Sequence, residues 1–272
     1  MNEHRRVVIT GLGAVTPIGN DVESMWAALL AGQSGAGPIT RFDTTDFSTK
    51  IACEVTDFDG RELLGKKEAR RYDRFAQFGV VAALEAMTHS GLDGPPPGVA
   101  PDRFGVIFGS GIGGISTMEA QHDIIRERGP SRVSPFFIPM FIPDIAAGLI
   151  SIRFGARGPN YATVSACASS SHAIGDAFRF IERGDADIMI AGGAEATLTP
   201  LAVAGFASMK ALSTRNQDPK GASRPFDAGR DGFVIGEGAG CLVIEALETA
   251  TARGATIVAE LIGYGVSADA HH

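Results

Sequence analysis

The chain has 272 residues, of which 44% are hydrophobic and 20% charged, so it can build a substantial core. Its formal net charge of −7 argues against a protein whose whole surface favours binding to nucleic acid. No apolar run approaches the roughly 18 residues that a membrane helix needs.

Neither the amino-terminal residues nor the cysteine content indicates a secreted protein. Residues Met1–Arg6 lead straight into a strand-like run, without the apolar stretch and cleavage site of a secretory signal. Three cysteines at irregular spacing, Cys53, Cys167 and Cys241, fit free thiols in a reducing compartment. We therefore expect a cytoplasmic protein.

Glycine is unusually frequent, with 35 residues, about twice the usual share. The glycines cluster after apolar runs instead of repeating at a fixed period. Because glycine permits positive φ and close approach of backbones, the clusters predict tight turns around a crowded site. The clusters are Gly11/Gly13, Gly109–Gly114, Gly192/Gly193 and Gly236–Gly240.

The first half of the chain alternates between predicted strands and helices. Asn20 or Asp21 can cap the first helix, which Gly32 ends, and Gly91 ends the next one. The apolar runs without polar interruption are typical of buried strands. The expected elements are strands at 7–9 and 106–108 and helices at 21–31, 66–90, 116–128 and 143–154.

The second half predicts a strand–helix–strand unit around Cys167. Residues 161–165 form the first strand, an amphipathic helix follows and ends at Gly184, and residues 188–191 form the second strand. Such a unit favours a sheet that is parallel in part. No linker-like change of composition occurs, so one continuous α/β domain is favoured. Further strands are expected at 233–235, 241–245 and 257–266, and a helix at 247–253.

Cys167 lies in the turn between the predicted strand and helix, within the small residues Ala166–Ser170. A helix amino terminus presents unpaired N–H groups and partial positive charge, which stabilise a thiolate, the nucleophilic form. The same N–H groups can stabilise an oxyanion in acyl transfer. The alternative is a cysteine that packs as a small hydrophobic residue, to which we assign Cys53 and Cys241.

Five motifs in order along the chain resemble those of 3-oxoacyl-[acyl-carrier-protein] synthases of the type II class. The segment Val164–Ser170 is similar to the active-site elbow of these enzymes. Each motif alone is weak, but the five together span nearly the whole chain. Thiolases and type III synthases differ around their cysteine, and chain-length factors usually lack it. The other motifs are Val7–Gly13, Gly109–Gly114, Ala191–Glu195, and Ser223–Asp227 with Asp231–Phe233.

The resemblance implies a thiolase-like α/β fold, in which two similar halves pack as layers α-β-α-β-α. This chain corresponds to the first half, residues 1–255 with the nucleophile elbow, and to the opening strand of the second, residues 256–272. We therefore expect a fragment of a longer protein. One face of its sheet would lack its packing partner, and exposed apolar area of that size favours association.

The resemblance also implies a condensing enzyme of fatty-acid elongation. Cys167 would accept an acyl group from an acyl carrier protein, and its backbone N–H would contribute to the oxyanion hole. Malonyl-acyl-carrier-protein would then lose CO₂, and its carbanion would attack the acyl-enzyme. The remaining family positions are Ile112, Phe137 and Phe206 for the acyl pocket and Asp269 and His272 for a gating loop.

Phe136 and Phe137 match a segment that approaches the partner subunit's pocket in the family homodimer, so a homodimer is expected.

The family's two catalytic histidines and its lysine lie in the carboxy-terminal part, after the position of His272. His172 is expected to pack or cap; the alternative is a general base, which requires hydrogen-bond reach. We expect that these 272 residues alone do not catalyse the condensation reaction.

A nicotinamide-dependent oxidoreductase is the alternative enzyme class. Gly109–Gly114 satisfies the G-x-G-x-x-G pattern after a predicted strand, and Glu127 lies near where a ribose-binding acid would be sought. Glu127 falls within a helical run, however, and not at the end of a second strand as that fingerprint requires. We expect no cofactor and no metal site.

A basic segment, residues 66–74, predicts a docking surface. Four of its cations lie three or four residues apart in pairs, which would place them on one face of a helix: Lys67, Arg70, Arg71 and Arg74. The resemblance implies that the acidic acyl carrier protein docks here; the alternative is a solvated helix face. A non-catalytic carrier-binding or dimerisation module also remains open. The expected docking residues are Lys67, Arg70, Arg71, Arg132 and Lys210.

Overall fold

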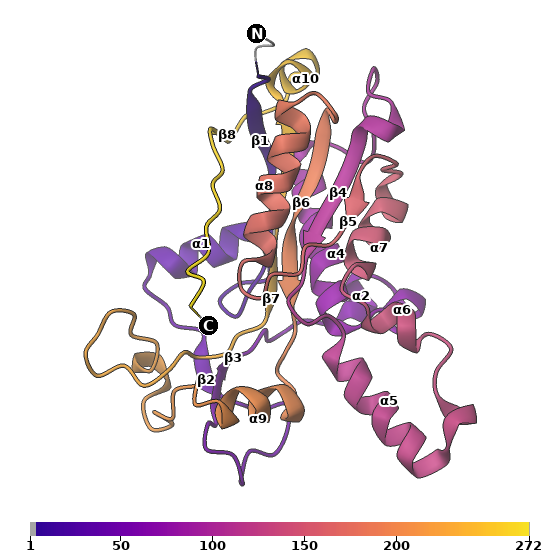
Figure 1. Cartoon of the computed structure of the whole chain (residues 1–272). Helices are drawn as coiled ribbons and strands as arrows, with labels where there is room; N and C mark the ends of the chain where they lie inside the picture. Colours follow the sequence, from indigo (N-terminus) through magenta and orange to yellow (C-terminus); the bar gives the residue numbers. More distant parts are fainter. Residues whose placement is uncertain (1–3, 272) are drawn as a thin grey trace.

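The computed structural model describes residues 4–271, which are built around one mixed β-sheet (Figure 1). Its strands are β1 (Val7–Val15), β4 (Phe104–Gly109), β5 (Asn160–Tyr161), β6 (Ile188–Glu195), β7 (Gly238–Ala246) and β8 (Ala259–Leu261). Their order across the sheet is β5-β4-β6-β7-β1-β8. β4 pairs in parallel with β5 and β6, whereas β6–β7, β7–β1 and β1–β8 are antiparallel pairs.

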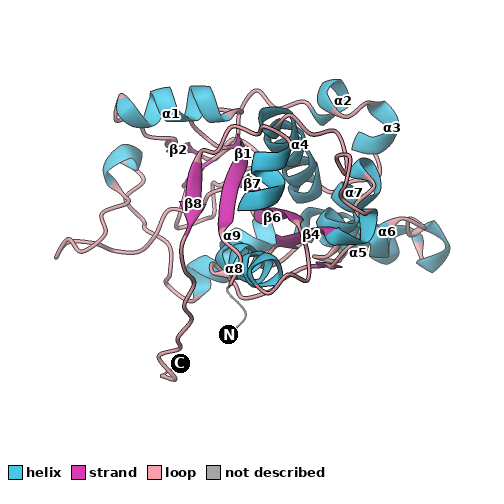
Figure 2. Cartoon of the chain, turned by 90° about the horizontal axis from the view of Figure 1, so that it is seen from above, coloured by secondary structure: helices cyan, strands magenta, loops and turns pink. Residues whose placement is uncertain are grey.

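Helices cover both faces of this sheet (Figure 2), so the expectation that one face would lack its packing partner is wrong. α8 (Ser169–Glu182) packs on one face, and α4 (Arg74–Ser90) and α7 (Ile145–Phe154) pack on the other. Successive residues of a strand point to opposite faces. Accordingly Val106 and Phe108 join the core under α4, whereas Ile107 joins the core under α8. The strands at the centre are apolar without interruption because both of their faces are buried.

A smaller layer lies beside the carboxyl ends of β4 and β6. β2 (Ala36–Pro38) and β3 (Ile51–Cys53) form an antiparallel pair, and α9 (Pro200–Ser208) packs near them around Leu198 and Val203. The other helices are α1 (Val22–Leu30), α2 (Gly60–Leu63), α3 (Lys66–Ala69), α5 (Ile115–Arg128), α6 (Phe137–Phe141), α10 (Leu247–Ala252), and the 3₁₀ helices η1 (Pro101–Arg103), η2 (Pro130–Arg132) and η3 (Pro219–Gly221).

Several sequence predictions are confirmed at their boundaries. Asp21, and not Asn20, caps α1, because its carboxylate accepts a hydrogen bond from the Ser24 N–H. Gly91 ends α4 in the left-handed conformation at φ 72°. The α/β class and the partly parallel sheet are confirmed as well. No helix of residues 4–271 is long and apolar enough to cross a membrane.

The prediction of one helix over residues 66–90 is wrong. The chain leaves helical conformation after Ala69, and α4 begins only at Arg74. Asp73 causes the break: its backbone is extended, and its carboxylate accepts from the Phe75 N–H and from Thr117 at the start of α5. The basic residues therefore do not share one helical face.

Three predicted strands are shorter or absent. The strand expected at 161–165 is only Asn160–Tyr161, because the hydroxyl of Thr163 and the N–H of Ser165 turn away to bond Ser169. Residues 233–235 make only an isolated bridge at Phe233. The strand expected at 257–266 pairs with β1 over Ala259–Leu261 alone, at the edge of the sheet.

Candidate active site

Cys167 lies on a tight turn between β5 and α8, with an exposed side chain. The residue before it, Ala166, has a positive φ of 48°, a conformation that a residue with a Cβ rarely adopts. Ser169 holds the turn, since its hydroxyl donates to the Ala166 carbonyl at 2.7 Å and accepts from the Ser165 N–H at 2.9 Å. His172 Nδ1 lies 2.7 Å from Ser165 Oγ, which braces the same turn from the helix.

Glycines allow this turn to sit directly on the sheet. A Cβ added at Gly109, at the end of β4, would lie 2.6 Å from the Ser169 carbonyl carbon. A Cβ added at Gly193 in β6 would lie 2.9 Å from the side chain of Ser170. Side chains at these two positions would therefore push the first turn of α8, and Cys167 with it, off the strands. The prediction of glycines around a crowded site is confirmed for the clusters at 109–114, 192–193 and 236–240, which contribute to the cavity lining, but is wrong for Gly11 and Gly13, which pack against α4.

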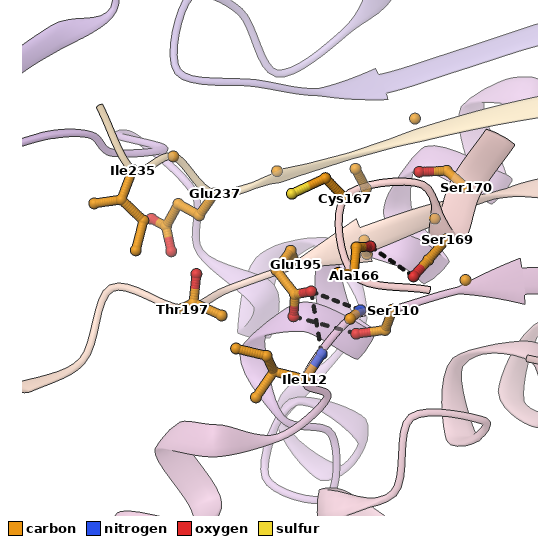
Figure 3. A pocket seen from close by; sticks show the side chains of 18 of the residues that line it. Ser110, Ile112, Ala166, Cys167, Ser169, Ser170, Glu195, Thr197, Ile235 and Glu237 are labelled. Carbon is orange, nitrogen blue, oxygen red and sulfur yellow. Dashed lines mark hydrogen bonds between the residues drawn. The ribbon is translucent and has the colours of Figure 1, made fainter. Parts of the chain in front are cut away.

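A cavity of about 630 Å³ opens beside Cys167 (Figure 3). It is lined mostly by apolar groups and by glycine backbone. Ile112, from the loop between β4 and α5, and Phe206 of α9 both line it. Phe206 packs edge-on against Phe233, with ring centroids 5.6 Å apart. The structure therefore brings together three of the predicted residues, Cys167, Ile112 and Phe206.

Glu195, at the end of β6, is a carboxylate that lines the same cavity. Its Oε2 accepts from the N–H groups of Gly111 at 2.7 Å and Ile112 at 3.2 Å, and its Oε1 accepts from the Ser110 hydroxyl at 3.2 Å (Figure 3). Burial raises the pKa of Glu195, and these hydrogen bonds to the carboxylate oppose the rise. The sequence motif contained this residue, but its contact with the glycine loop was not predicted.

This contact decides against the nicotinamide alternative. In a dinucleotide fold the glycine-loop N–H groups bind a pyrophosphate. Here the Gly111 and Ile112 N–H groups already donate to Glu195, so they are not free to bind a phosphate. Glu127 lies within α5, at an exposed position. The G-x-G-x-x-G pattern therefore serves an internal carboxylate and not a nucleotide.

A second carboxylate, Glu237, reaches the cavity from the segment before β7. Its side chain is 1% exposed and pairs with Arg74, whose guanidinium donates to both carboxylate oxygens at 2.8 and 3.0 Å. The Val55 N–H donates to the same carboxylate. The guanidinium also lies 4.6 Å from the ring centroid of Phe78. This buried pair joins the start of α4 to the cavity lining.

Comparison with known proteins places this geometry in a family. Residues 4–250 match the family described as Beta-ketoacyl synthase, N-terminal domain. The chain belongs to the beta-ketoacyl synthase family. It is 54% identical over its whole length to the 3-oxoacyl-[acyl-carrier-protein] synthase 2 of Staphylococcus aureus (strain COL), and 53% identical over 270 residues to that of Synechocystis sp.. It spans 65% and 64% of the length of these two relatives.

Solved structures of beta-ketoacyl synthases have the same fold. A beta-ketoacyl synthase from Burkholderia phymatum STM815 superposes with a TM-score of 0.88 at 36% identity, covering 98% of this chain and 65% of that one. A type II polyketide ketosynthase, solved in complex with its acyl carrier protein and bound to the hexaketide, superposes at 0.86 with 32% identity, covering 99% of this chain and 65% of that one. The thiolase-like fold is therefore confirmed.

Other residues that the beta-ketoacyl synthase motifs predict lie away from this cavity. Phe137 begins α6 and packs against Phe141, with ring centroids 5.8 Å apart, and is not among the cavity-lining residues. Asp269 is exposed near the end of the described chain and accepts a hydrogen bond from the His271 N–H. His272 lies outside the described residues. The cavity of this chain alone therefore uses neither Phe137 nor Asp269.

The predicted docking residues are exposed, although they do not share a helix face. Lys67 is in α3, and Arg70 and Arg71 follow it in the turn before α4. Arg71 lies over the ring of Phe136, 4.8 Å from its centroid, which ties this turn to α6. The other two predicted residues are Arg132, in η2, and Lys210, at φ 58° after α9. Arg74, by contrast, is committed to Glu237.

Histidine and the cationic side chains are missing from the cavity lining of the described chain. No histidine, lysine or arginine is among the residues that line it, and its titratable groups are Cys167, Glu195 and Glu237. His172 is held by Ser165, as the prediction that it packs or caps requires.

The two remaining cysteines differ from Cys167: Cys241 is buried in β7 and Cys53 is partly buried in β3, and burial raises the pKa of both thiols.

The raised pKa of Glu195 predicts a pH dependence of stability. The folded state holds the Glu195 proton more tightly than the unfolded state, whose pKa is near 4.5. The contribution of Glu195 to the free energy of unfolding is therefore largest below pH 4.5 and falls as the pH rises through the raised pKa. Glu195→Gln removes this contribution. Urea titrations at acidic and neutral pH measure the free energy of unfolding of both proteins. The value for the variant should increase relative to that of the wild type as the pH rises. A difference between the two that does not change with pH would contradict the assignment.

Proposed function

We propose that this chain is the acyl-accepting part of a condensing enzyme of fatty-acid elongation, with Cys167 as the nucleophile. The single observation that carries the proposal is the position of Cys167, exposed at the amino terminus of α8 and facing an apolar cavity of about 630 Å³. Thiolate, helix N–H groups and an apolar chain site are what acyl transfer from a thioester requires. Relatives named 3-oxoacyl-[acyl-carrier-protein] synthase 2 support it.

The proposed first step is a thioester exchange. The Cys167 sulfur attacks the carbonyl carbon of an acyl thioester, and the Cys167 N–H helps to stabilise the oxyanion. The bond from that carbon to the donor sulfur then breaks, and the donor leaves as a thiol that takes the proton of Cys167. In the second step malonyl-acyl-carrier-protein loses CO₂, its carbanion attacks the acyl-enzyme carbonyl, and the Cys167 sulfur leaves.

Acylation without condensation is the expected behaviour of the 272-residue chain. Incubated with an acyl-loaded carrier protein, it should gain the mass of the acyl group on the Cys167 peptide, and Cys167→Ser should not form the thioester. Added malonyl-carrier protein should yield no 3-oxoacyl product, because no histidine or lysine of the described residues lines the cavity. Mass spectrometry of the peptides measures the acylation of Cys167, and product analysis measures the 3-oxoacyl product. Absence of acyl transfer to Cys167 would refute the first step.

We also propose that an acyl carrier protein docks on the exposed cations around α3. Lys67, Arg70 and Arg71 are exposed there, and Arg132 and Lys210 are exposed elsewhere on the surface. Carrier proteins are acidic, so opposite charge would raise the association rate in a salt-dependent way. The related polyketide ketosynthase solved with its acyl carrier protein supports this kind of partner.

Arg70→Glu is expected to weaken carrier-protein binding by about three- to tenfold at low salt, because it reverses an exposed charge at the proposed contact. Surface plasmon resonance at two salt concentrations measures the change, which should shrink at high salt because of screening. Arg183→Glu is the control, because Arg183 is exposed at the end of α8, on the opposite face of the sheet from α4. Unchanged affinity of the Arg70 variant at low salt would remove α3 from the docking surface.

A homodimer, in which Phe137 approaches the cavity of the partner, completes the proposal. Its support is that Phe137 is not among the residues lining this chain's own cavity, and that the neighbouring Phe136 is exposed. Asp269 is proposed as part of a gate at the cavity entrance. Sedimentation analysis of the purified chain and of Phe137→Ala tests the dimer.

A further inference from the structure

The middle of the loop that carries Ile112 is held in place by one carboxylate. Glu195 accepts three hydrogen bonds from this loop, defined here as residues 110–113. The loop also closes on itself, since the Gly113 N–H donates to the Ser110 hydroxyl at 3.0 Å. Glu195 therefore connects the end of β6 to the loop between β4 and α5.

The fit between this loop and Glu195 is close. A Cβ added at Gly111 would lie 2.8 Å from Glu195 Oε2 and 3.4 Å from the Cα of Ala166, the residue before the nucleophile. Gly113 adopts φ 78°, and its Cβ position is blocked by the carbonyl of Phe141 at 2.7 Å. The loop is therefore confined between Glu195, the Cys167 turn and α6, and its side chain at 112 enters the cavity.

Ile112 lines the cavity through a backbone that has no regular secondary structure. Residues 110–113 lie between the end of β4 and the start of α5, outside the ladder and the helix. Backbone bonds fix the two ends, where the Ser110 N–H donates to the Thr163 carbonyl at 3.3 Å and the Gly114 N–H donates to the Phe141 carbonyl at 2.9 Å, whereas the Gly111 and Ile112 N–H groups donate to Glu195. The hydrogen bonds to Glu195 take the place of such bonds. Removal of the carboxylate would leave the Gly111 and Ile112 N–H groups without these acceptors and would release the loop.

We propose that Glu195 is a positioning residue that sets the length of apolar chain admitted at Cys167, by holding Ile112 in the cavity. The inference rests on the proposed function of that cavity as an acyl site. Once released, the 110–113 loop can move away from Cys167 and make room for a longer chain. Glu195 itself takes no part in the bond-making steps.

Alkylation of Cys167 by maleimides of two lengths tests this without requiring acyl transfer. The rate constants for N-ethylmaleimide and N-octylmaleimide are measured by peptide mass spectrometry on the full chain. In Glu195→Ala the ratio of the octyl to the ethyl rate constant is expected to rise about fivefold, while the ethyl rate stays within about twofold of wild type. Glu195→Gln should restore the wild-type ratio, because its amide oxygen can accept both N–H groups and its NH₂ can donate to Ser110.

Glu54→Ala is the matched control. Glu54 is also a buried carboxylate that accepts hydrogen bonds from a loop, through the Thr40 N–H and hydroxyl, but it does not line the cavity. It should lower stability without changing the ratio. If Glu195→Ala does not fold, Ser110→Ala, which removes one donor to Glu195 and the acceptor for Gly113, should raise the ratio less. An unchanged ratio in the folded variants would overturn the proposal, whereas failure of acyl transfer with a changed ratio would overturn only the proposed function.

Discussion

Cys167 should be alkylated about 100-fold faster than Cys241 when the folded chain meets a limiting amount of iodoacetamide, with Cys53 closer to Cys241 than to Cys167. Thiolate is the reacting form, and access decides which thiolate meets the reagent. Cys167 is exposed at the start of α8, whereas Cys241 is 2% exposed and burial raises its pKa. Burial also raises the pKa of Cys53, which is only partly covered.

The measurement is quantitative peptide mass spectrometry over a time course. The same experiment in concentrated urea is the control, because unfolding should bring the three rates together. Equal rates in the folded protein would show that no reactive thiol is assembled at Cys167. That result would favour the alternative of a non-catalytic carrier-binding or dimerisation module.

Much of the fold could be predicted because its signals are local. The central strands are apolar without interruption, and glycine and aspartate mark the helix ends, as Asp21 and Gly91 do. The break in the 66–90 helix could not be predicted in this way. Asp73 interrupts it by bonding the start of α5, Ser116 and Thr117, more than forty residues along the chain. A contact of that range leaves no periodic signal in the sequence.

The residues of the candidate site show the same difference between local signals and long-range contacts. The position of Cys167 between a strand and a helix followed from its flanking residues, and the family resemblance supplied Ile112 and Phe206, which share its cavity. Glu195 and Glu237 were missed as cavity residues. Each is defined by tertiary partners, the glycine loop for Glu195 and Arg74 for Glu237. The one available signal for Glu195 was a carboxylate following a glycine pair at a strand end.

Arg74→Leu is expected to lower the free energy of unfolding by about 3–5 kcal/mol, the largest stability effect of any single change proposed for this chain. Arg74 and Glu237 form a pair whose side chains are 19% and 1% exposed. Without the guanidinium, the Glu237 carboxylate stays buried with the Val55 N–H as its remaining donor. An uncompensated buried charge costs far more than a lost surface ion pair.

Arg153→Leu provides the matched comparison, because Arg153 pairs with Glu68 at the surface, with side chains 35% and 40% exposed. That variant should lose only about 0–1 kcal/mol. Urea unfolding of both variants measures the difference, and equal losses would contradict the role of burial.

The double variant Arg74→Leu/Glu237→Leu separates stability from cavity shape. Replacing both members of a buried pair by apolar residues is often neutral, so most of the lost stability should return. Glu237 lines the cavity beside Cys167, however, and its carboxylate is fixed there by Arg74. If stability returns while Cys167 reacts differently with N-octylmaleimide, the pair serves the geometry of the cavity. If both return to wild-type values, the pair contributes no more than any well-packed apolar contact would.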